Sequence, residues 1–203
     1  MPNWCRTRIS FRNTAEKLKA LDVAFREATK PSPENVKVGH TSLAELLIYM
    51  GLSLDDTKHQ GRISYYWADN KEIYIETVTA WAPMLAVFRL FADKYAPGTN
   101  IVYTAEEPGC GLYWTNDPEI RNLYYADGHI EGELSDLCDL VNQSPETVAR
   151  TLEDELGLPL TEDSSDEHIQ ELCRKANERI RKENLEFYLI LKPYEFVELT
   201  EVA

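Results

Sequence analysis

The stretch that decides the fold is Cys5-Arg6-Thr7-Arg8-Ile9-Ser10-Phe11, close to the start of a chain of 203 residues. Its small and apolar residues alternate with arginines and a serine. Successive side chains of a β-strand point to opposite faces of the sheet, so this alternation predicts a strand that is buried on one side only. The buried side would hold Cys5, Thr7, Ile9 and Phe11, and the open side would hold Arg6, Arg8 and Ser10.

Outward from this strand, the spacing of the apolar residues predicts the other elements of a sheet with helices. Residues 14–29 and 83–95 have helical spacing, whereas residues 63–68, 73–79 and 101–105 are rich in β-forming residues. The resulting order, β-α-β-β-α-β, predicts an α+β fold. We expect the ferredoxin-like split βαβ arrangement, an antiparallel sheet with its helices on one face. A short helix at 42–50 would be an insertion.

The net charge lies entirely in the second half of the chain. Residues 1–115 carry 13 Lys and Arg against 13 Asp and Glu, whereas residues 116–203 carry 8 against 22, which accounts for the formal charge of −14. The second half is patterned mainly as helices, with β-rich runs near 123–126 and 186–199. We therefore predict a ferredoxin-like domain at 1–120 and an acidic, mostly helical α/β extension at 121–203. The last strand could equally return to the first sheet and make one domain.

Several classes of protein are excluded by the composition. The first residues lack the apolar run of a signal peptide, and no stretch approaches the ~20 apolar residues of a membrane span. The four cysteines are isolated and form no CxxC pair, which favours reduced thiols in a cytoplasmic protein. No cofactor motif and no catalytic motif stand out, so we expect no cofactor and favour a non-enzymatic function.

Scattered pieces of the first half resemble a known family. They are Met1-Pro2-Asn3-Trp4-Cys5, Glu76-Thr77 before Thr79-Ala80-Trp81-Ala82-Pro83, and Tyr103 with Glu106-Glu107-Pro108-Gly109. These pieces are similar to the YubB-like proteins, a ferredoxin-like-domain family of plasmids, phages and other mobile elements. The resemblance implies a ferredoxin-like fold over roughly residues 1–130 and a mobile-element context. It implies no catalytic residues, because the family has no assigned function, and Arg6-Thr7-Arg8 stands where the family pattern has an Asn.

The acidic second half carries the main functional hypothesis. If Val148, Leu152 and Leu156 pack inward, the neighbouring carboxylates should point outward and share a negative field. Such a field repels nucleic acid and anionic membranes and attracts a protein with a basic surface. We therefore expect a protein-binding or inhibitor module whose partner-binding residues are Glu146, Glu153, Asp154, Glu155, Glu162, Asp163, Asp166 and Glu167. The same residues could instead only keep the protein soluble.

Single-stranded nucleic acid is the alternative ligand. Arg6 and Arg8 on one strand face, with Tyr66 and Tyr74 on neighbouring strands, could form a sheet surface that stacks bases and binds phosphates. The competing interpretation is that Glu76 or Glu106 pairs with these arginines. A net charge of −14 opposes binding to phosphates, so nucleic acid is not the partner that the sequence predicts.

A metal-dependent hydrolase is the second alternative. Asp127, His129, Glu131 and Glu133 alternate, and on one strand they would present oxygen and nitrogen ligands to the same side. Such residues are equally typical of a solvated edge strand. Trp81 and Pro83, at the end of one predicted strand and the start of a helix, are expected to be structural.

Overall fold

The computed structural model describes residues 3–30, 41–52, 61–129, 137, 140–183 and 188–199. The chain is an α+β protein and divides into two compact units. Unit 1 contains the residues up to Asp117 together with those from Val197 onward, and unit 2 runs from Pro118 to Phe196. Each unit has its own hydrophobic core. Among the described residues, no helix is long and apolar enough to cross a membrane.

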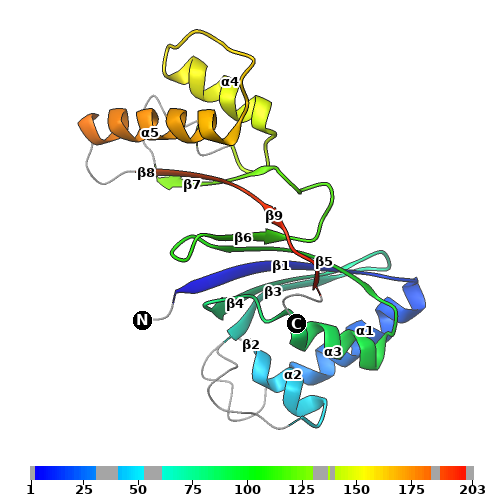
Figure 1. Ribbon diagram of the computed structural model, residues 1–203. Helices are drawn as coiled ribbons and strands as arrows, with labels where there is room; N and C mark the ends of the chain where they lie inside the picture. Colours follow the sequence, from blue (N-terminus) through cyan, green and yellow to red (C-terminus); the bar gives the residue numbers. More distant parts are fainter. Residues whose placement is uncertain are drawn as a thin grey trace. The chain divides into compact units, whose positions relative to one another are not determined.

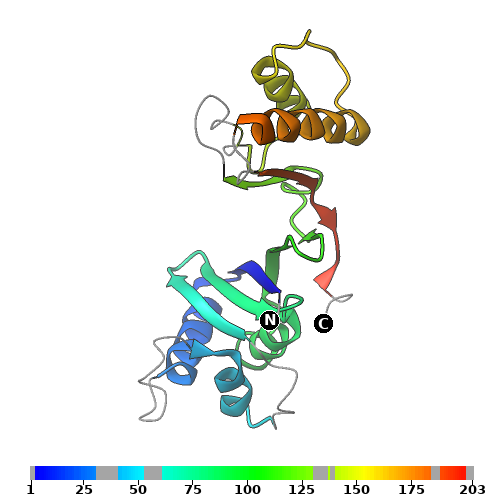
Figure 2. The same ribbon diagram turned by 90° about the vertical axis from the view of Figure 1, so that its left-hand side faces the viewer.

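Unit 1 is an antiparallel sheet covered by helices on one face (Figures 1 and 2). Its strands lie in the order β2-β3-β4-β1-β5-β6, and neighbours in this order run antiparallel. In chain order the elements are β1 (Trp4–Arg12), α1 (Ala15–Ala28), β2 (Thr41–Ser42), α2 (Leu43–Tyr49), β3 (Gly61–Ala68), β4 (Ile73–Ala80), α3 (Leu85–Tyr95), β5 (Asn100–Glu107) and β6 (Leu112–Thr115).

The core of unit 1 lies between the sheet and its helices. The strand pattern predicted for residues 5–11 is confirmed, because burial alternates along β1. Phe25 of α1 stacks on Phe91 of α3 with ring centroids 4.4 Å apart, and Phe11 of β1 meets Phe25 edge-on at 5.6 Å. Such aromatic contacts add to the free energy of burying the rings.

The inserted helix α2 lies where the sequence predicts it, whereas α3 begins later than predicted. The Ser42 hydroxyl caps α2 by accepting a hydrogen bond from the Ala44 N–H at 3.2 Å, as helix N-caps usually do. Pro83 is buried, but α3 begins two residues later, at Leu85. The expected structural role of Trp81 does not come from burial of its side chain, which is 55% exposed. Its backbone φ of 72° is rare for a non-glycine residue.

Unit 2 packs two helices against a two-stranded antiparallel sheet (Figure 1). Val148 and Leu152 of the stripe predicted for α4 are buried in its core, and Leu156 is partly buried against it. Helix α5 contributes Ile169, Leu172 and Ala176 to the same core. Helix α5 is capped by Ser165, whose hydroxyl accepts a hydrogen bond from the His168 N–H at 3.3 Å. The elements are β7 (Tyr124–His129), α4 (Pro145–Glu155), α5 (Asp166–Glu183), β8 (Tyr188–Pro193) and β9 (Glu195–Phe196).

The end of the chain returns to unit 1. The Val197 N–H donates a hydrogen bond to the Thr115 carbonyl at 2.9 Å, and its carbonyl accepts one from the Tyr103 hydroxyl at 2.8 Å. Leu199 is buried in the core of unit 1. Unit 1 is therefore built from both ends of the sequence, and unit 2 is inserted between them.

Candidate binding surfaces

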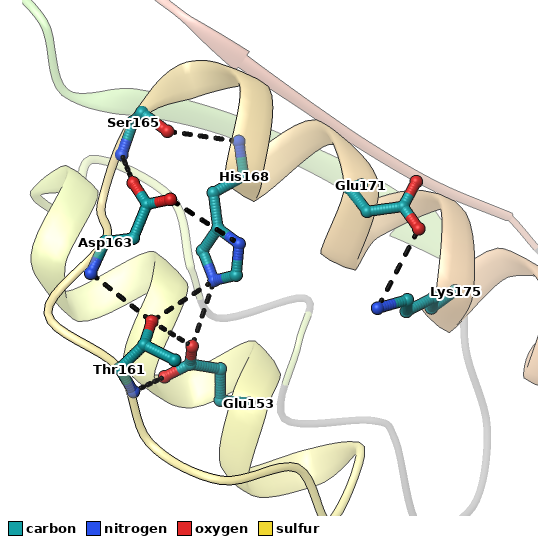
Figure 3. Close-up of polar contacts among 7 residues, drawn as sticks. All are labelled: Glu153, Thr161, Asp163, Ser165, His168, Glu171 and Lys175. Atoms are coloured by element: carbon teal, nitrogen blue, oxygen red, sulfur yellow. Dashed lines mark hydrogen bonds and ion pairs between the residues drawn. The ribbon is translucent and has the colours of Figure 1, made fainter.

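The acidic residues of unit 2 do not all face solvent, and Glu153 is the clearest exception. Its side chain is only 1% exposed, so its predicted place on an outward surface is wrong. Figure 3 shows why. One carboxylate oxygen of Glu153 accepts a hydrogen bond from the Thr161 hydroxyl at 2.6 Å and lies 2.9 Å from Nε2 of His168, while the other accepts from the Thr161 N–H at 2.9 Å. A carboxylate can be buried when hydrogen-bond donors surround it in this way.

This network joins α4, the following loop and α5. The hydrogen bonds from Thr161 and then from His168 lower the pKa of Glu153. The side chain of Ser165 and then its N–H, which donates to Asp163 at 3.0 Å, lower the pKa of Asp163. Its other oxygen lies 4.0 Å from Nδ1 of His168. His168 therefore lies between two carboxylates, and the loop is held by side-chain bonds.

The other seven predicted carboxylates reach the surface. Glu146, Asp154, Glu162 and Glu167 face solvent, and Glu155 is half-buried. Asp166 is also exposed, although it accepts hydrogen bonds from the Tyr124 hydroxyl at 2.6 Å and from Gln170. Because hydrogen bonds from neutral groups leave the negative charge in place, seven of the eight predicted carboxylates contribute to a surface field. We call these seven the acidic end of unit 2: Glu146, Asp154, Glu155, Glu162, Asp163, Asp166 and Glu167.

The field does not extend along the whole of α5. Arg174 forms ion pairs with Glu171 at 2.6 Å and with Glu178, and Lys175 lies 3.8 Å from Glu171. The last turn of α5 is basic, with Arg181 and Lys182. Unit 2 is therefore polarised along α5, from an acidic first turn to a basic last turn.

The second candidate surface is the face of the unit 1 sheet that lies opposite its helices. The strand registers place its residues in rows that run across the strands. From β3 through β4 and β1 to β5, the rows are Arg62-Val78-Arg6-Glu106, Tyr65-Glu76-Arg8-Thr104 and Trp67-Tyr74-Ser10-Val102; the row before them pairs Ala80 with Trp4. We call this surface the outer face.

Tyr66, predicted to lie on this face, lies on the other one. It pairs with Ile75, and its hydroxyl donates a hydrogen bond to Asp22 of α1 at 2.5 Å. The cause is a β-bulge between Ile63 and Tyr65, which adds one residue and reverses the alternation of all that follow. Tyr65 and Trp67 therefore take the outward positions, and a simple alternation pattern could not have identified them.

The other predicted residues of the outer face are placed as expected. Arg8 pairs with the buried Glu106 at 2.9 Å, which is the interpretation that competed with nucleic-acid binding. The Tyr74 hydroxyl donates to Glu76 at 2.9 Å, and its partial burial with this bond raises its pKa to about 12. Arg6 and Arg62 are exposed. This face holds a hollow of about 270 Å³, which is lined by Arg6, Thr7, Arg8, Ser64, Glu76, Thr77 and Val78.

The described residues give little support to a metal or cysteine site. Asp127 and His129 belong to β7, whereas Glu131 and Glu133 lie outside the described residues. No group of three His, Cys, Asp or Glu side chains that could hold a metal ion occurs within the described ranges. Burial raises the pKa of the Cys5 thiol to about 11 and also raises that of Cys173, so neither is a thiolate at neutral pH.

No family model, no curated protein and no solved structure matches this chain. Its function must therefore be argued from its own surfaces.

Proposed function

We propose that this chain is a non-enzymatic binding protein, and that the acidic end of unit 2 engages a partner protein with a basic surface. The observation that carries the proposal is the concentration of seven surface carboxylates within 22 residues, from Glu146 to Glu167, where Arg150 is the one Lys or Arg. A field of this kind steers a basic partner and raises its association rate.

The network around Glu153 supports the same proposal. A charged surface gives specificity when its groups are held in fixed positions. The loop at 161–165 carries Glu162 and Asp163. Thr161 donates two hydrogen bonds to Glu153 of α4, and the Ser165 hydroxyl accepts one from the His168 N–H of α5, so the loop is held between the two helices. The network therefore gives Glu162 and Asp163 defined positions on the surface.

We further propose that unit 1 has the split βαβ arrangement. Its strand order β3-β4-β1-β5 is antiparallel throughout, and α1 and α3 each connect strands that are not neighbours. The order and the directions agree with those of the ferredoxin-like class. The resemblance to the YubB-like proteins is compatible with this order and would place the protein in a mobile element.

The proposal is tested by capturing partners from an extract of the native host with wild-type protein and two variants of equal charge. The first variant, D154N/E162Q/E167Q, removes three charges from the acidic end. The control variant, E16Q/E27Q/D93N, removes three exposed charges from the helices of unit 1. We expect basic proteins that are retained by the wild type and the control but lost by the first variant.

Comparing the two variants distinguishes binding at the acidic end from a general effect of the protein's net charge. If both variants lose the same proteins equally, net charge alone accounts for binding and the proposal is wrong. If neither variant loses any, the acidic end has no role in binding.

A further inference from the structure

The outer face of unit 1 presents aromatic side chains that its own packing does not require. Tyr65 is 51% exposed, Trp67 44% and Trp4 51%. None of these three side chains belongs to the hydrophobic core, which lies on the opposite face of the sheet. Trp81, which directly follows the β4 residue paired with Trp4, is exposed as well. Large exposed aromatic groups gathered on one surface are typical of binding sites.

Two arginines of this face lie on either side of an apolar residue, Val78. Val78 on β4 has Arg62 as its neighbour on β3 and Arg6 as its neighbour on β1. With strands about 4.8 Å apart, the backbones of the two arginines lie about 10 Å from each other. On its β5 side Arg6 neighbours Glu106, but the Glu106 carboxylate is bonded to Arg8. The row therefore presents two cations with no carboxylate between them.

The order of these groups along the strands suggests an extended ligand. Trp4 lies at one end, the arginine row follows, and Tyr65, Trp67 and Tyr74 lie beyond it. From Trp4 to Ser10, which is level with Trp67, β1 rises about 20 Å. A ligand that follows the strands meets an aromatic group, then cations, then aromatic groups again.

We propose that the outer face binds single-stranded nucleic acid, which lies along β1 and β4. Two or three bases stack on Trp4, Tyr65 and Trp67, and the phosphates between them bind Arg6 and Arg62. Base stacking on aromatic side chains with cations that follow the backbone is how sheet surfaces bind single strands. Acidic peptides share the negative charge but lack planar groups, so they would leave the aromatic side chains unused.

The charge of unit 1 itself does not oppose this inference, because exposed charges act mainly over about one Debye length, roughly 8 Å at physiological salt. Residues 1–115 have no net charge, and the outer face has more arginines than glutamates near the hollow, with Arg6, Arg8 and Arg62 against Glu76 and Glu106.

Binding is measured with fluorescein-labelled oligo(U) and oligo(dT) of about eight nucleotides, by anisotropy and by quenching of tryptophan fluorescence. We expect both oligonucleotides to bind the full chain with a Kd of about 1–100 µM at low salt, with quenching, because the exposed tryptophans stack on bases. A preference for oligo(U) would identify RNA as the ligand, and equal binding would identify any single strand.

Matched variants localise the site. R6Q/R62Q should weaken binding and reduce the slope of log K against log salt by about 1.4, the value for two lost phosphate contacts. The control R26Q/K30Q removes one cation from α1 and one from just beyond its C-terminal end. It should change neither the affinity nor the salt slope. W67L should weaken binding about tenfold, whereas Y49L on α2 should have no effect.

Three results would overturn the inference. They are no binding of either oligonucleotide at low salt, equal weakening by R6Q/R62Q and R26Q/K30Q, or binding of polyglutamate as strong as that of oligo(U) with W67L unaffected. The last result would show a general anion surface that suits an acidic protein segment. Circular dichroism of each variant confirms that it folds.

Discussion

At the scale of single residues, the two threonines on the buried side of β4 differ in their hydrogen bonds. The Thr79 hydroxyl donates to the Ala82 carbonyl at 2.8 Å. The Thr77 hydroxyl is buried and has no hydrogen-bond partner among the described residues. An unsatisfied buried hydroxyl costs free energy, because water would have bonded it in the unfolded chain.

This difference predicts opposite effects of the same substitution. Thr77→Val replaces the unsatisfied hydroxyl by a methyl group of similar size, and we expect it to raise the free energy of unfolding by about 1 kcal/mol. Thr79→Val removes a bonded hydroxyl and should lower it by about 1 kcal/mol. Chemical denaturation of both variants measures the two changes. Equal destabilisation by both would mean that Thr77 is bonded in solution.

At the scale of elements, the Glu153 network predicts how the contact between α4 and α5 responds to pH. The folded pKa of Glu153 lies below its ordinary value of 4.5. A lowered folded pKa means that the carboxylate stabilises the protein above that ordinary value, and that this contribution is lost as the pH falls through the lowered pKa. Glu153→Gln should therefore lower the Tm at neutral pH, and the difference from wild type should shrink below pH 4.5.

The exposed neighbour Asp154 is the control for this prediction. Asp154→Asn changes the same charge on the same helix and should leave the Tm nearly unchanged at every pH. Should Glu153→Gln also leave the Tm unchanged at neutral pH, the network would not stabilise the contact between α4 and α5.

The elements also show what sequence patterns could and could not predict. The alternation at 5–11 and the helical stripes at Phe25, Phe91 and Leu152 were predictable, because burial follows the strand and helix periods directly. The positions of Tyr65 and Trp67 were not, because a bulge leaves no clear mark in the alternation of a short strand. Burial of Glu153 was also hidden, since its donors come from a loop eight residues away and from the next helix.

The sequence therefore predicted only some residues of each candidate surface. It identified Val148 and Leu152 as the buried side of α4, and with them the exposure of Glu146 and Asp154 on the same helix. It could not identify Trp4 or Arg62 as part of the outer face, because neighbours across a sheet depend on strand order and register. These are properties of the tertiary structure.

At the scale of the whole molecule, the return of the chain predicts that the C-terminal segment stabilises unit 1. Leu199→Ala should lower the free energy of unfolding of unit 1 by about 2–3 kcal/mol, because it removes a buried side chain. Tryptophan fluorescence reports unit 1 selectively, since all four tryptophans precede residue 118. Glu198→Ala, at the exposed neighbouring position, should have no effect. An unchanged midpoint for Leu199→Ala would show that the segment contributes nothing to unit 1.

The central claim is that the acidic end of unit 2 is the binding surface. The most direct test is the association rate of a captured partner. It is measured by stopped flow at several salt concentrations for wild type, D154N/E162Q/E167Q and the control E16Q/E27Q/D93N. We predict that the acidic-end variant associates about tenfold more slowly than the control at low salt, and that the two converge at high salt as steering is screened. Equal association rates for the two variants at low salt would contradict the claim.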